Sequence, residues 1–144
     1  MLSPSSHLRR QHDQLLDLTN QVSPYLKSTQ LVTKHAETIR TLLSKIAGLL
    51  KIHLSIEDQS FYPALLSSEN TEVVTIVLNV QLEIADIGRM FNGYIETYHS
   101  SEKIQSEPEP FIKDTNALFN ALIKRIEKEN NELFPLYDKL INSV

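Results

Sequence analysis

Apolar residues recur every three or four positions along most of the chain, which is the spacing of one face of an α-helix. The clearest stripe runs through Val74, Val77, Ile84, Phe91 and Ile95. Similar stripes lie before and after it. The pattern therefore predicts four helices, over roughly residues 5–27, 30–67, 71–99 and 110–142.

Polar, turn-forming stretches separate these segments. Ser23 and Pro24 interrupt the chain after the first segment, residues 67–71 are all polar, and residues 100–110 contain two prolines. Short connections between long helices favour antiparallel neighbours. We therefore expect an all-α protein, an antiparallel up-down-up-down four-helix bundle that forms a single domain over residues 1–144.

Composition excludes several classes of function. The 144 residues carry a formal net charge of −4, so we expect no nucleic-acid partner, which would need a basic surface. There is no cysteine, which rules out disulfides and thiolate metal sites. Because the chain shows neither an apolar run long enough for a membrane span nor a signal-peptide pattern, we expect a cytoplasmic protein without a membrane partner.

Polar residues interrupt the apolar stripes at inward-facing positions, where burial without a partner would be costly. In an up-down bundle, the beginnings of the first and third helices and the ends of the second and fourth share one end of the molecule. The interrupting residues should therefore form one polar layer there. They are His12, His53, Glu57, Gln81, Arg125 and Glu129.

His53 and Glu57 are the most informative pair in this layer. They are four residues apart, so they lie on one helix face with a rise of about 6 Å between them. An imidazole nitrogen and a carboxylate oxygen at this spacing can reach a common metal ion.

The two halves of the chain also resemble each other. The segment Glu57–Pro63 matches Glu129–Pro135 in length and in its end residues, so the chain looks like two copies of one helical hairpin. We expect Pro63 and Pro135, like Pro24, to kink or end a helix locally. The aromatic residues before these prolines are expected to pack the end of the bundle.

The pair His53-x-x-x-Glu57, the following Phe61-Tyr62-Pro63, the repeated Glu129 to Pro135 segment, and His12 roughly 40 residues upstream together resemble the hemerythrin-like (HHE) cation-binding family. The resemblance covers essentially the whole chain. In that family, histidines of the first two helices bind one iron, those of the last two bind a second, and two carboxylates bridge them. It implies that His12 and His53 are metal ligands, with Glu57 and Glu129 as the carboxylates.

The second half of such a site is replaced. Arg125 stands four residues before Glu129, where the resemblance implies a histidine, and Gln81 stands in place of the other. Arginine is permanently cationic and a poor metal ligand. The sequence therefore predicts one metal ion held by His12, His53, Glu57 and Glu129, not a di-iron centre.

The residues around this predicted metal site can also be assigned roles. Arg125 would neutralise the carboxylates, Gln81 would hydrogen-bond beside them, and His7 is a candidate for lining the pocket. His35 and His99 are expected at the far end of the bundle. The resemblance implies iron, while two nitrogens and two carboxylate oxygens also suit zinc or manganese.

Two hypotheses of function follow. In the first, the protein binds one metal ion that can take a small ligand such as dioxygen or nitric oxide. In the second, Arg125 replaces the metal altogether, and the protein is a metal-free structural or regulatory bundle. An enzymatic role is disfavoured because family chemistry is expected to need paired metals. Ferritin-like chemistry is disfavoured because its Glu-x-x-His spacing is missing.

Overall fold

The computed structural model describes residues 2–143, and in this range every regular element is a helix. The all-α prediction is therefore confirmed. In chain order the elements are α1 (Ser6–Val22), the 3-10 turn η1 (Ser23–Lys27), α2 (Thr29–Lys34), α3 (Ala36–Ile56), the π-helical turn η2 (Glu57–Phe61), α4 (Tyr62–Leu66), α5 (Thr71–Glu83), α6 (Ile87–Thr97), α7 (Ser101–Ser106), α8 (Pro108–Lys128), the π-helical turn η3 (Glu129–Leu133) and α9 (Phe134–Asn142).

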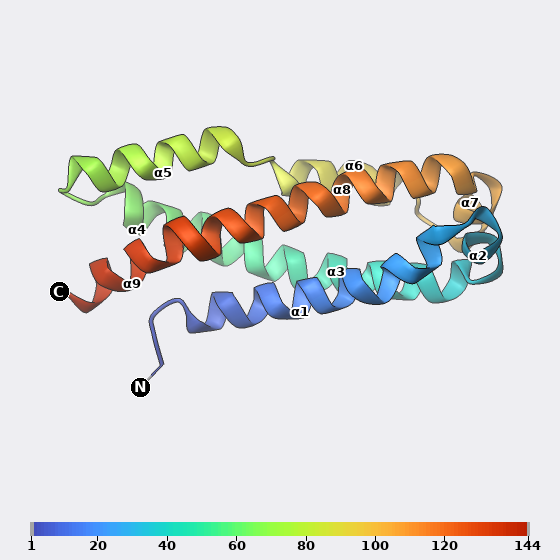
Figure 1. The fold of residues 1–144 in the computed structure, drawn as a ribbon, viewed down its shortest axis with the longest axis horizontal. Coiled ribbons are helices and arrows are strands. Elements are labelled where there is room, and N and C mark those ends of the chain that lie inside the picture. The colour runs from blue at the N-terminus through green and yellow to red at the C-terminus, as the bar shows by residue number, and fades with distance from the viewer. Residues whose placement is uncertain (1, 144) are drawn as a thin grey trace.

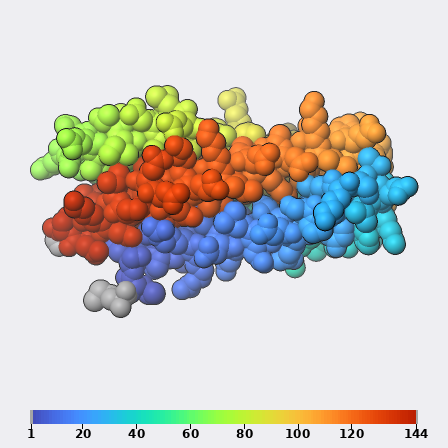
Figure 2. Space-filling model, in the orientation of Figure 1, coloured from blue at the N-terminus to red at the C-terminus, as the bar shows by residue number. Residues whose placement is uncertain are grey.

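The long elements lie side by side along one axis (Figure 1). α1 runs from the end that carries both termini to the opposite end, where η1 and α2 turn the chain. α3 and α4 return, α5 and α6 run forward again, and α8 and α9 come back after the turn through α7. The space-filling view shows the resulting elongated shape, with the first and last helices in contact along one face (Figure 2). None of the helices in residues 2–143 is both long enough and apolar enough to cross a membrane.

Polar side chains cap four of the helix beginnings, which explains why the chain breaks where it does. The N–H of Leu31 donates to Ser28 Oγ at 3.1 Å at the beginning of α2, and α7 begins in the same way at Ser100. Asn70 caps α5 and Asp86 caps α6. These contacts satisfy backbone donors that a helix cannot satisfy itself.

Two apolar clusters fill the interior, and the polar layer lies between them. The larger cluster includes Leu15, Leu50 and Ile126, whereas the smaller one, nearer the termini, includes Leu8, Phe61 and Leu133. Along α1 and along the α3–η2 and α8–η3 segments, the polar residues come between members of the two clusters. The layer is therefore shielded from water on both sides.

Of the three predicted proline distortions, that at Pro24 is the 3-10 turn η1 after the end of α1, and those at Pro63 and Pro135 are π-helical turns. The N–H of Tyr62 donates to the carbonyl of Glu57, and the N–H of Phe134 donates to that of Glu129, each five residues back. Proline has no N–H, and its ring clashes with the carbonyl four residues earlier, so an ordinary α-helical turn is unfavourable before Pro63 and Pro135. Each helix widens for one turn and then continues, and both wide turns begin at a carboxylate of the polar layer.

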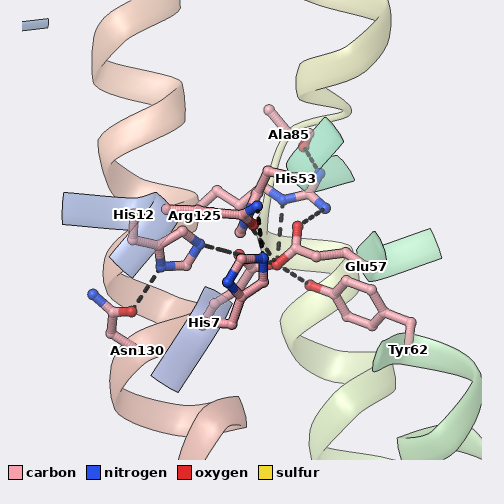
Figure 3. Close-up of polar contacts among 10 residues, drawn as sticks. His7, His12, His53, Glu57, Tyr62, Ala85, Arg125 and Asn130 are labelled. Carbon is pink, nitrogen blue, oxygen red and sulfur yellow. Dashed lines mark hydrogen bonds and ion pairs between the residues drawn. The ribbon is translucent and has the colours of Figure 1, made fainter. Parts of the chain in front are cut away.

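The third predicted helix, roughly residues 71–99, is in fact two helices. Ile84 has extended backbone geometry, and α6 begins again at Ile87 under the Asp86 cap. Before the break, α5 buries Val77 and Val80, whereas Gln81, which the stripe placed inward, is exposed. At the break, the carbonyl of Ala85 points at the polar layer (Figure 3).

Candidate metal centre

Four buried side chains from three segments of the bundle converge on one point (Figure 3). His12 comes from α1, His53 from the end of α3, and Glu57 and Glu129 from the first positions of the two π-helical turns. One ligand atom of each residue lies within 4.8 Å of the other three. These are the four residues that the sequence predicted as ligands, and the fold brings them together although they lie far apart in the chain.

Each histidine uses its Nδ1 to contact an amide oxygen. His12 Nδ1 lies 2.7 Å from Asn130 Oδ1, and His53 Nδ1 lies 2.6 Å from Gln11 Oε1. An amide oxygen only accepts, so each Nδ1 carries the ring proton and each Nε2 presents a lone pair. Metal-binding histidines use this arrangement: one ring nitrogen binds the metal, and the N–H of the other holds the ring in position.

Each carboxylate also uses one oxygen for protein contacts. Glu57 Oε1 accepts from Arg125 Nη2 at 3.2 Å. Glu129 Oε2 accepts from Arg125 Nε at 3.3 Å and from the hydroxyl of Tyr62 at 2.6 Å. One guanidinium group therefore holds both carboxylates, and hydrogen bonds between charged groups of this kind are among the stronger ones in proteins.

The remaining atom of each residue faces the shared point. His12 Nε2, His53 Nε2, Glu57 Oε2 and Glu129 Oε1 are buried and have no hydrogen-bond partner among the described residues. We call these four the inner atoms. His12 Nε2 lies 3.1 Å from Glu129 Oε1, and His53 Nε2 lies 3.2 Å from Glu57 Oε2.

Lone pairs at these distances repel one another unless a shared proton or a cation lies between them. Buried polar atoms normally have partners, and four without any at one point call for an explanation such as an ion. Two imidazole nitrogens and two carboxylate oxygens form a donor set that suits iron, zinc or manganese. The residues therefore fit one metal ion.

Burial and mutual repulsion shape the charges of the layer. Burial, reinforced by the negative charge of Glu129, raises the pKa of Glu57 well above its usual value. Burial also acts to raise the pKa of Glu129, but contacts with His12 and Glu57 and the charge of Arg125 outweigh it and lower that pKa to about 2. Burial, and then the neighbouring His12, lower the pKa of His53 to about 3. Without a metal, burial and the repulsion between the two carboxylates therefore favour a proton on Glu57, and a bound cation would compete with that proton.

The second half-site contains no cluster of ligands among the described residues. Arg125 is only 9 % exposed, and burial acts to lower its pKa, but the charges of Glu129 and Glu57 raise it above the ordinary value. Gln81 lies outside the layer, on the wall of a cleft of about 500 Å³ that Arg125 and Tyr62 also line. His7 is exposed and reaches the layer indirectly, through the amide of Gln11 at 3.3 Å.

Sequence reasoning did not identify three residues that support the centre. Gln11 and Asn130 orient the two histidines, and each is the chain neighbour of a predicted ligand, one position away from the apolar stripe. Tyr62 was expected to pack the bundle end. It does pack there, at 6 % exposure, and its hydroxyl also binds Glu129. A buried tyrosine needs a partner for its hydroxyl, which is the signal that could have found it.

Aromatic packing fixes the histidine rings. The ring of Phe134 stacks on that of His12 with centroids 5.0 Å apart and an interplanar angle of 21°. The rings of His12 and His53 lie 4.6 Å apart. Because Phe134 is the last residue before Pro135, the wide π-helical turn places both Glu129 and the ring that holds His12.

Comparison with known proteins agrees with this geometry. A family model described as the hemerythrin HHE cation binding domain matches residues 3–137, nearly the whole chain. No curated protein and no solved structure gives a match.

Replacing Tyr62 by phenylalanine removes the 2.6 Å hydrogen bond to Glu129 while keeping the ring in place. A hydrogen bond to a buried charged group contributes about 1.5–3 kcal/mol, so we expect Tyr62→Phe to lower the free energy of unfolding of metal-depleted protein by that amount. Urea denaturation measures the change. Tyr137→Phe is the matched control, because Tyr137 packs against Phe61 but its hydroxyl has no hydrogen bond among the described residues. Equal losses in the two variants would contradict the assignment.

Proposed function

Because this chain belongs to the hemerythrin HHE cation-binding domain family, we propose that it binds a single metal ion through His12, His53, Glu57 and Glu129. We also propose that residues 1–144 form one domain with the antiparallel up-down-up-down four-helix topology of that family. The course of the helices in Figure 1 supports this topology.

One observation carries the proposal of metal binding. Each of the four residues contacts the protein through one polar atom and leaves its other polar atom buried and unpartnered toward the same point. Supporting contacts of this kind, which hold ligands in position, are typical of metal centres. A bound ion would accept the lone pairs of the four inner atoms and balance the negative charge of the two carboxylates.

Iron is the metal that we propose, on the strength of the family. Zinc and manganese accept the same two nitrogens and two oxygens, so both belong in any metal analysis. A metal that takes five or six ligands keeps free positions beside four protein ligands. We propose that a small molecule such as dioxygen or nitric oxide binds there. A new visible absorption band on adding nitric oxide to the ferrous protein under argon would support this step, and an unchanged spectrum would reject it.

Arg125 also supports a second candidate function, a metal-free bundle with a structural or regulatory role. Its guanidinium contacts Glu57 at 3.2 Å and Glu129 at 3.3 Å, and so supplies positive charge to the carboxylates without any metal. It reaches only Glu57 Oε1 and Glu129 Oε2, which we call the outer oxygens. The inner atoms are left without a partner, which is why we favour the metal-binding function.

Metal content separates the two functions. Protein purified without chelator should contain about one metal ion per chain, measured by inductively coupled plasma mass spectrometry. His53→Ala removes one inner atom and should lower the content to nearly zero. His99→Ala, which changes an exposed histidine, should leave it unchanged. Metal content that is low in all three proteins, or equal in the first two, would reject the proposal.

Thermal unfolding with and without chelator gives an independent check. An ion present at 100 times its dissociation constant stabilises the folded state by about 2.7 kcal/mol. For a domain of this size that is a melting temperature about 5–10 °C higher. We expect chelator to remove this increase in the wild type and to have no effect on His53→Ala. A melting temperature that does not respond to chelator in the wild type is the result that the metal-free function predicts.

A further inference from the structure

Arg125 contacts the two carboxylates through the oxygens that are not inner atoms. Its Nη2 and Nε contact Glu57 Oε1 and Glu129 Oε2, while Oε2 of Glu57 and Oε1 of Glu129 face the proposed ion. Each carboxylate would therefore be shared between a metal ion on one side and the guanidinium on the other. The guanidinium becomes a fixed neighbour of the ion, separated from it by one carboxylate group.

The position of this positive charge is unusually constrained. Besides the two carboxylates, Arg125 Nη1 donates to the carbonyl of Ala85 at 3.5 Å, and the guanidinium carbon lies 5.9 Å from the ring centre of Tyr62. The side chain is only 11 % exposed. Arginine does not lose its proton in proteins, so neither titration nor movement into water removes the charge.

The net charge of the layer then depends on the valence of the ion. Two ionised carboxylates and Arg125 sum to −1, and the histidines are neutral as ligands. A divalent ion brings the layer to +1 and a trivalent ion to +2. Apolar clusters lie on both sides, and the nearest charges at the cleft, Asp58 and Asp86, are exposed and screened by water. The additional positive charge of a trivalent ion is therefore poorly compensated.

We propose that Arg125 sets the valence of the bound ion, so that the site holds a divalent metal and disfavours a trivalent one. This inference rests on the proposed function. It gives the arginine a specific role as the residue that determines metal selectivity, beyond filling the place of a second ion. For iron, a site that disfavours the trivalent ion would oppose oxidation of the bound ferrous ion.

The size of the effect follows from Coulomb's law. Two unit charges about 6 Å apart at an effective dielectric constant of about 20 repel enough to change an equilibrium about 100-fold. Removing the charge of Arg125 should therefore raise the affinity for a trivalent ion, relative to a divalent one, about 100-fold. For iron, this ratio corresponds to a reduction potential lower by about 120 mV, at 59 mV per tenfold change.

The test compares two neutral variants, Arg125→Gln and Arg125→Met, with the charge-conserving Arg125→Lys and the wild type. Arg10→Gln is the matched control, because it removes one positive charge from an exposed position two residues before His12. Purification with Zn²⁺ keeps a positive charge beside the buried carboxylates of the neutral variants. Circular dichroism checks that each variant is folded.

Two measurements apply to every variant. Competition with nitrilotriacetate gives the affinities for Zn²⁺ and for Ga³⁺, a trivalent ion without redox chemistry, and voltammetry gives the potential of the iron-loaded protein. We expect the Ga³⁺ to Zn²⁺ affinity ratio to rise about 100-fold in whichever neutral variants fold, and to change little in Arg125→Lys and Arg10→Gln. The use of a ratio cancels losses that affect both ions equally.

The outcomes separate this inference from the function on which it rests. An unchanged ratio and an unchanged potential in the neutral variants, with Zn²⁺ still bound, would overturn the role of Arg125 alone. A shift as large in Arg10→Gln would also overturn it, because the effect would then reflect overall charge. A wild type that binds neither ion would instead reject the proposed metal site.

Discussion

The structure depends on the burial of two carboxylates side by side. Glu57 and Glu129 are both fully shielded from water, and two like charges in such surroundings are strongly unfavourable without positive charge. The fold supplies part of that charge through Arg125 on the outer oxygens. It also positions two imidazole lone pairs and two oxygens where a metal ion could supply the rest. The wide helical turns that begin at both carboxylates are part of the same arrangement, because each follows from a proline six residues later.

The sequence was sufficient to predict most of the polar layer. Interruptions of an apolar stripe mark buried polar residues, and antiparallel helices bring the ends of alternate segments together, so His12, His53 and Glu129 could be placed without coordinates. The same reasoning found Arg125, because its distance from Glu129 repeats that of His53 from Glu57. These predictions succeeded because they rest on periodicity within long helices, where the direction of a side chain follows from its position.

The remaining features depend on geometry that periodicity does not encode. Gln11 and Asn130 lie one position away from the stripe, where the pattern predicts a partly solvated residue, and only their contacts across the bundle show their role. The break at Ile84 arises from a local change of backbone and the cap at Asp86, within a stripe that continues through it. The stripe also placed Gln81 inward, but this residue is exposed on α5.

The central claim is that one metal ion lies among the four inner atoms, with Arg125 in place of a second. Anomalous diffraction from crystals of protein loaded with Zn²⁺, recorded on both sides of the zinc absorption edge, tests it most directly. We predict a single anomalous peak within bonding distance of His12 Nε2, His53 Nε2, Glu57 Oε2 and Glu129 Oε1. A crystal of zinc-loaded protein with no peak at that point, or with a second peak beside Arg125, would contradict it.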